Sequence, residues 1–103
     1  MNRLFIDTLF VVALINPRDQ YHEIALKLST DYEGYPLLTT DCVLLEIGNA
    51  LARNFKAQAV EILDDFTESN EVKIIHLNPL LFDKAYRIYR KYKDKEWGLV
   101  LQR

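Results

Sequence analysis

Asp7 and Glu46 are the residues whose positions most suggest chemistry. Asp7 follows a short apolar run, and Glu46 lies inside the stretch 39–53. On a helix, Glu46 would lie on or beside an apolar stripe, because it comes three residues after Val43 and four before Ala50. A carboxylate against a core is costly unless a cation or hydrogen-bond donors meet it. The alternative for Glu46 is a boundary residue whose head group reaches water.

The stretch 39–53 is predicted to be the central helix of the chain. Thr40 or Asp41 can cap its first free N–H groups. Its core-facing stripe is expected to consist of Val43, Ile47, Ala50 and Leu51.

Short apolar runs alternate with helical patterns along the whole chain. The predicted strands are 4–6, 36–39 and 72–77, and the other predicted helices are 9–15, 21–28, 56–67 and about 81–92. Such alternation indicates an α/β layer fold with a mostly parallel sheet. The chemistry of these folds lies at the carboxyl ends of the strands.

Both carboxylates are expected at that edge of the sheet. Asp7 ends the first strand, and the helix bearing Glu46 begins just beyond the second. Two carboxylates about 4 Å apart would repel by roughly 4 kcal/mol at an effective dielectric constant near 20. A divalent cation would remove this repulsion, and carboxylate oxygens suit Mg²⁺ or Mn²⁺.

Length and composition indicate one intracellular domain. The 103 residues predict a single domain over 1–103, and half of them are apolar. The net charge of −2 gives no overall basic field for nucleic acid. Cys42 is the only cysteine, which suits a reducing cytoplasm, and the N-terminus resembles neither a signal peptide nor a membrane span.

Basic and aromatic residues in the last predicted helix leave two alternatives open. Lys84, Arg87 and Lys91 share one face, which is either a phosphate-contacting ridge for RNA or a solvated helix face. Tyr86, Tyr89 and Tyr92 are either stacking platforms or, as we expect, core or boundary residues.

The remaining polar candidates are expected to be structural. His22 and His76 are isolated in the sequence, and Cys42 has no adjacent base. Cys42 is therefore interpreted as a small buried apolar residue.

Four segments in order resemble a PIN-domain protein, and in particular the small VapC-like ribonuclease toxins. They are Phe5-Ile6-Asp7-Thr8, residues 19–25, residues 38–53 and residues 94–99. The resemblance implies a metal-dependent endoribonuclease in which three or four acidic residues hold Mg²⁺ or Mn²⁺. Asp7 and Glu46 match two of these acidic residues, and Thr8 matches the small polar residue beside the first. The cation would activate water for attack on an RNA phosphodiester.

The resemblance also implies partners and a departure from the family pattern. Family members usually pair with an antitoxin and often form dimers. A Ser/Thr-Asp pair carrying the third acidic ligand is expected after Trp97-Gly98-Leu99, but Val100 to Arg103 follow instead. Asp94 is the only nearby carboxylate that might replace it.

The expected fold is therefore a PIN-like three-layer α/β fold with a short, mostly parallel sheet flanked by helices and with the last strands missing. Residues 4–6 would then form an open apolar edge, which is a template for pairing with another chain. A homodimer or higher oligomer follows as a hypothesis.

Two functions remain open. The first is an Mg²⁺- or Mn²⁺-dependent endoribonuclease of toxin–antitoxin type that works through Asp7 and Glu46. The second is a catalytically defective PIN-fold remnant that serves as a binding or oligomerisation module.

Overall fold

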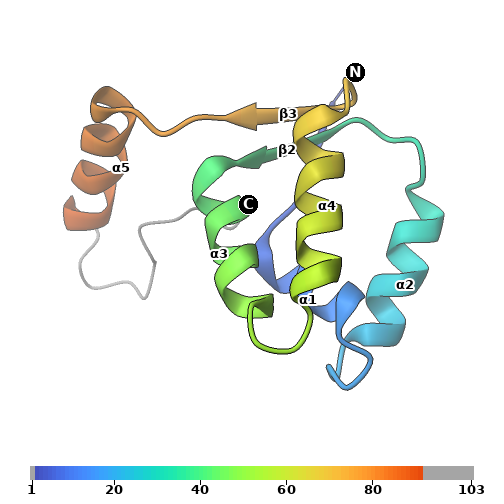
Figure 1. The fold of residues 1–103 in the computed structure, drawn as a ribbon. Helices are drawn as coiled ribbons and strands as arrows, with labels where there is room; N and C mark the ends of the chain where they lie inside the picture. Colours follow the sequence, from blue (N-terminus) through green and yellow to red (C-terminus); the bar gives the residue numbers. More distant parts are fainter. Residues whose placement is uncertain (1, 92–103) are drawn as a thin grey trace.

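The computed structural model describes residues 2–91. In chain order the elements are β1 (Leu4–Phe5), α1 (Thr8–Ile15), α2 (His22–Asp31), β2 (Leu37–Thr40), α3 (Asp41–Leu51), α4 (Lys56–Glu68), β3 (Val72–Ile75) and α5 (Pro79–Lys91). Figure 1 shows α1 to α4 gathered together, with α5 standing apart from them beyond the end of β3. Every predicted element is present, with boundaries shifted by a few residues.

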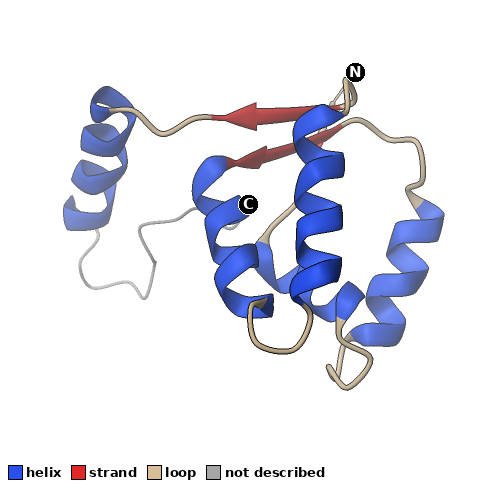
Figure 2. Cartoon of the chain, viewed as in Figure 1, coloured by secondary structure: helices blue, strands red, loops and turns tan. Residues whose placement is uncertain are grey.

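The three strands are parallel and lie in the order β1-β2-β3. Figure 2 shows β2 and β3 side by side. Leu4 pairs with Leu37 across the first two strands, and Leu37 in turn pairs with Val72 of β3. The predicted α/β fold with a parallel sheet is confirmed. In the sheet formed by residues 2–91, β1 lies at one edge, as expected for the apolar run 4–6.

The core forms where α3 packs against α1 and α4. Its buried members are Val11, Val43, Ile47, Leu51 and Ala59. Thr40 caps α3, because its Oγ1 accepts a hydrogen bond from the N–H of Val43 at 3.1 Å. Most of the predicted stripe is buried, but Ala50 is exposed. Successive residues of a helix are 100° apart, so Ala50 lies toward Glu46, at the margin of the buried arc.

In α2 and α4, fewer apolar residues are buried than the helical spacing of apolar residues suggests. Ala25 and Ala59 are buried, whereas Ile24, Leu28 and Val60 are exposed. Small side chains at the contact positions let these helices approach their neighbours closely, and the larger residues beside them remain at the surface.

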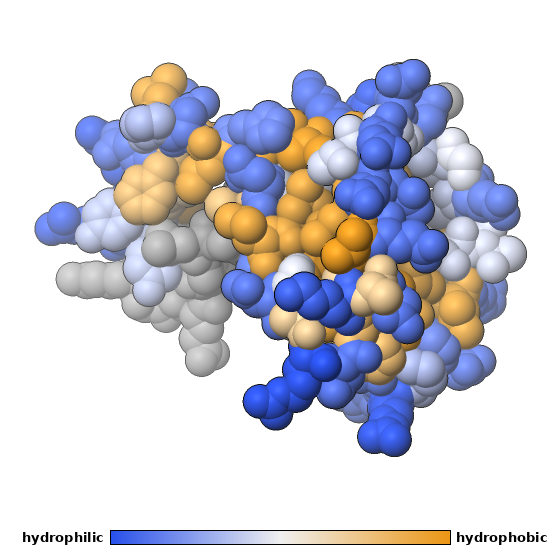
Figure 3. Space-filling view, in the orientation of Figure 1, coloured by the Kyte–Doolittle hydropathy of each residue, from blue (hydrophilic) through white to orange (hydrophobic). Residues whose placement is uncertain are grey.

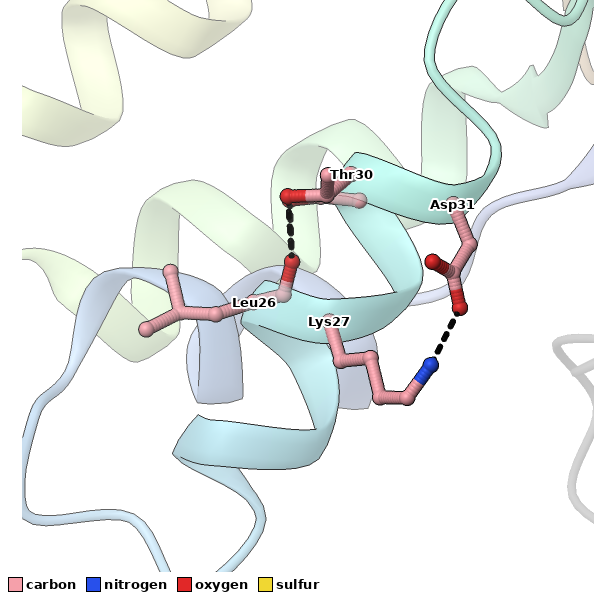
Figure 4. Close-up of polar contacts among 5 residues, drawn as sticks. Leu26, Lys27, Thr30 and Asp31 are labelled. Atoms are coloured by element: carbon pink, nitrogen blue, oxygen red, sulfur yellow. Dashed lines mark hydrogen bonds and ion pairs between the residues drawn. The ribbon is translucent and has the colours of Figure 1, made fainter.

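The last turn of α2 is held by local contacts (Figure 4). Nζ of Lys27 lies 2.8 Å from Oδ2 of Asp31, and Oγ1 of Thr30 donates to the carbonyl oxygen of Leu26 at 3.2 Å. The hydrogen bond to Asp31, together with its charge, raises the pKa of Lys27. Exposed pairs of this kind stabilise a fold only slightly.

The helix α5 is well capped, but none of its residues is buried. The N–H of Leu81 donates to Oδ1 of Asn78 at 2.8 Å, and Pro79 occupies the first helical position. Ala85 is the only α5 residue that is even partly buried. The expectation that Tyr86 and Tyr89 belong to the core or its boundary is therefore wrong. Tyr92 lies outside the described residues.

Within residues 2–91, no helix is both long enough and apolar enough to cross a membrane.

Candidate functional site

Polar residues follow all three strands at the same edge of the sheet. Asp7 comes two residues after β1, α3 begins directly after β2, and His76 follows β3. Because the strands are parallel, their carboxyl ends meet at one edge, where ligands bind in folds of this class. The structure thus places Asp7 and the start of the Glu46 helix at this edge.

Asp7 is fixed in position by the helix that it caps. The N–H of Phe10 donates to its Oδ1 at 3.0 Å, and the extended backbone of Asp7 is typical of an N-cap. Its Oδ2 has no hydrogen-bond partner among residues 2–91. One carboxylate oxygen therefore orients the side chain, and the other remains for a ligand.

Glu46 lies in the middle of α3, between the buried stripe and the surface. Its Oε1 is buried and has no hydrogen-bond partner within the described part of the chain. A buried carboxylate oxygen without a donor or cation is strongly unfavourable. This unsatisfied oxygen is the clearest mark of a ligand site in the structure.

Thr8, the first residue of α1, has the same property. Its Oγ1 is buried and makes no hydrogen bond with any described residue. A hydroxyl can donate one hydrogen bond and accept two. The resemblance had already matched Thr8 to the small polar residue beside the first acidic residue, but it gave no reason to expect an unpartnered hydroxyl.

Asp41 has a role that the sequence did not reveal. Its Oδ1 and Oδ2 both accept from the N–H of Leu77, at 3.1 and 3.0 Å, and Nδ1 of His76 lies 3.4 Å from Oδ2. Asp41 is free for these contacts because Thr40 caps α3 instead. It ties the start of α3 to the segment that leads into α5. Since Leu77 is 36 residues away along the chain, local sequence patterns could not predict the contact.

Cys42 and His22 differ in how well they match expectation. Cys42 is only partly buried, and burial raises the pKa of its thiol, with smaller contributions from the charges of Asp41 and Glu46. Its interpretation as a small buried apolar residue is therefore wrong, because the side chain is only of intermediate exposure. Nδ1 of His22 lies 2.7 Å from the carbonyl oxygen of Ala13, which joins α2 to α1 and gives this histidine a structural contact.

A well-defined hollow in the described structure is separate from the carboxylates. It is an apolar pocket of about 370 Å³ between the first residues of β1 and β2 and the later turns of α2 and α4. Its walls include Leu4, Leu37, Tyr32, Ile62 and Phe66, and none of Asp7, Thr8 or Glu46 lines it. The two unsatisfied polar atoms therefore belong to a different site.

The residues at the carboxyl edge fit a divalent cation only in part. Glu46 Oε1 lacks a positive partner, and Mg²⁺ accepts one or two protein carboxylates when water and phosphate supply the other ligands. No group of three or more His, Cys, Asp or Glu residues suited to a metal occurs within residues 2–91. Asp94, the possible third carboxylate, lies outside the described residues.

The comparisons with known proteins agree with this architecture. The PIN domain family profile matches residues 4–101. A solved structure of Mycobacterium tuberculosis VapC20, described as a sarcin–ricin loop cleaving toxin, superposes with a TM-score of 0.78 at 26% identity and covers 94% of this chain and 74% of that chain. No functionally curated protein matches the sequence. Since the profile spans nearly the whole sequence, the chain belongs to the PIN domain family.

Proposed function

We propose that this chain is an endoribonuclease of toxin–antitoxin type that depends on Mg²⁺ or Mn²⁺. The buried, unpartnered Oε1 of Glu46, on a helix rooted at the same sheet edge as Asp7, is the observation that carries the proposal. The similarity to VapC20, which is described as a sarcin–ricin loop cleaving toxin, supports the same reaction class.

In this proposal Asp7 and Glu46 hold the cation. Oδ2 of Asp7 and Oε1 of Glu46 both lack a hydrogen-bond partner among the described residues. A bound divalent cation would activate water and neutralise charge on the phosphoryl oxygens. The Thr8 hydroxyl and the free N–H groups at the start of α1 can donate hydrogen bonds to a phosphate oxygen, since helix N-termini favour anions.

Two measurements test this proposal, one on the metal and one on the reaction. Mn²⁺ should raise the melting temperature of the wild-type chain, and RNA should be cleaved only when Mg²⁺ or Mn²⁺ is present. Asp7→Asn and Glu46→Gln should abolish both effects. Glu61→Gln, at an exposed glutamate of α4, is the matched control and should change neither. Metal-dependent cleavage that survives both site substitutions would overturn the proposal.

The alternative, a catalytically defective binding module, draws on one observation. Residues 2–91 contain no group of three or more His, Cys, Asp or Glu residues that could hold a metal ion. A folded chain that neither binds Mn²⁺ nor cleaves RNA would favour this function over the first.

The proposed partners are RNA, a cognate antitoxin and a second copy of the chain, in the cytoplasm. Within the described sheet, β1 pairs only with β2, and its other side is an edge. Edge strands are templates for association, so we expect a homodimer or higher oligomer. Light scattering over a range of protein concentrations tests this, and a uniform monomer would contradict it.

A further inference from the structure

The charges of this chain are divided unevenly between α5 and the rest. Residues 1–78 contain six Lys or Arg and twelve Asp or Glu, a net charge of −6. In α5, four Lys or Arg accompany one Asp, a net charge of +3. A polyanion would be repelled by most of the molecule and attracted to this helix. The overall net charge of −2 conceals this division.

The same helix carries a row of exposed aromatic rings. Phe82, Tyr86 and Tyr89 are 49%, 41% and 41% exposed. Their ring centroids are 6.2 and 6.5 Å apart along the row, and the planes of the first two rings differ by only 1°. At the α5 end of the molecule, Figure 3 shows apolar residues next to hydrophilic ones. Exposed aromatic faces with adjacent cations are typical of proteins on which single-stranded bases stack.

Two basic residues of α5 are unpaired within the described structure, and only Arg90 borders the aromatic row. Lys84 and Arg90 form no ion pair with the described residues, whereas Arg87 is paired with Asp83 at 2.8 Å. On the helical wheel Arg90 lies 40° from Tyr86, so a cation borders the aromatic row. A base on the ring and its phosphate on the cation can therefore be contacted together.

The N-terminal end of α5 lies at the sheet edge that carries the candidate site. Asn78 caps α5, and the preceding residue, Leu77, donates its N–H to both carboxylate oxygens of Asp41 at the start of α3. The helix thus begins where the β3 strand ends, at the sheet edge that also carries Asp7.

We propose that α5 is the surface on which this protein binds RNA, through bases that are unpaired where they meet the helix. Bases stack on Phe82, Tyr86 and Tyr89, while Arg90 contacts a phosphate. Duplex RNA fits poorly, because its bases are already stacked on one another and are not free to meet side-chain rings. This inference rests on the proposed ribonuclease function and assigns to it a docking surface.

The test is binding of a fluorescently labelled single-stranded RNA oligonucleotide to the full chain in EDTA, where no metal-dependent cleavage occurs. Tyr86→Ala should weaken binding at least about fivefold, since a stacked base contributes ~1–3 kcal/mol. Tyr21→Ala is the matched control, because Tyr21 is also exposed but precedes α2. Circular dichroism should show both variants folded, since neither ring is buried.

Charge is tested separately through salt dependence. Arg90→Gln should reduce the slope of log affinity against log salt by about 0.7, as expected for one phosphate contact to a single strand. Lys56→Gln, at an exposed lysine of α4, should leave the slope unchanged. The duplex of the same sequence should compete poorly with the single strand.

Three outcomes would overturn the inference. Equal RNA affinity of Tyr86→Ala and Tyr21→Ala would show that bases do not stack on the aromatic row. Equal competition by duplex RNA would show that α5 does not require unpaired bases. If Tyr86→Ala instead dissociates an oligomer without changing RNA affinity, the row is a contact between copies of the chain. If the wild-type chain binds the single strand in EDTA but cleaves no RNA in Mg²⁺ or Mn²⁺, only the proposed reaction is contradicted. The two failures are therefore distinguishable.

Discussion

The helices α3 and α5 each follow a strand and each have an apolar face, yet they use those faces differently. In α3, Val43, Ile47 and Leu51 are buried in the core. In α5 no residue is buried, and the aromatic rings lie at the surface of the described structure. The spacing of apolar residues therefore predicts that a helix has an apolar face, but it does not predict what that face contacts.

The connection to the preceding strand explains part of the difference. Thr40 is both the last residue of β2 and the N-cap of α3, so α3 turns back onto the sheet at once. Residues 76–78 separate β3 from α5, and Asp41 holds Leu77 near the start of α3. This geometry directs α5 away from α1 to α4 (Figure 1).

The largest expected effect is on stability, in a pair of matched isoleucines. Ile47→Ala should lower the free energy of unfolding by about 2–5 kcal/mol, because Ile47 is fully buried and its removal leaves a cavity. Ile88→Ala on α5 should change it by less than about 0.5 kcal/mol, since Ile88 is 48% exposed. Urea denaturation of both variants measures the difference. Similar losses would mean that α5 is buried against a surface in solution.

The sequence predicted α3 well because its signals are local. A polar cap followed by apolar residues at helical spacing decides where such a helix begins and which side is buried. The Asp41–Leu77 contact, the unsatisfied Thr8 hydroxyl and the exposure of Tyr86 could not be predicted in this way. Each depends on which elements meet in space, and no pattern within one element contains that information.

Glu46→Gln is expected to have the next largest effect, with opposite signs in the absence and presence of metal. Without metal, the substitution should raise the free energy of unfolding by on the order of 1 kcal/mol, since it replaces an unpartnered buried carboxylate oxygen with a neutral group of similar shape. In Mn²⁺, only the wild-type chain should gain stability. Thermal melts with EDTA or Mn²⁺ measure both effects.

The exposed Glu61→Gln variant serves as the control for that experiment. If Glu46→Gln is destabilising in EDTA, its Oε1 has a partner in solution that the described residues do not supply. A site on α3 would then need a different explanation, while the proposed role of α5 in binding would be unaffected.

Gly48→Ala should stabilise α3 by up to about 1 kcal/mol. A Cβ at Gly48 would meet Cδ1 of Leu63 at 3.8 Å, an ordinary contact, and alanine has the higher helix propensity. Gly34→Ala is the contrasting variant, because Gly34 has a φ of +86° that disfavours any side chain despite open space around it. The two midpoints of urea denaturation should move in opposite directions. A destabilised Gly48→Ala would show that α3 and α4 pack more closely than this distance implies.

The smallest effect concerns the thiol of Cys42, which reports on the environment at the start of α3. Burial raises its pKa, and the charges of Asp41 and Glu46 raise it further. Because the folded pKa is raised, this group's contribution to stability is fully present below the unfolded value of about 8.5 and is lost as the pH rises through the folded value. Alkylation by iodoacetamide near that pH should be slower in the folded chain than in urea.

A cysteine on α5 completes the comparison between the two helices. In a Cys42→Ala background, Ala85→Cys would place a thiol at the only partly buried position of α5, next to Lys84 in a helix of net positive charge. Neighbouring cations favour the thiolate, so this thiol should react faster with iodoacetamide than Cys42 does, and added salt should reduce its advantage. Equal rates would show that the charge on α5 is neutralised in solution. A basic surface that is already neutralised could not attract RNA, so this modest rate difference bears directly on the proposed function of the helix.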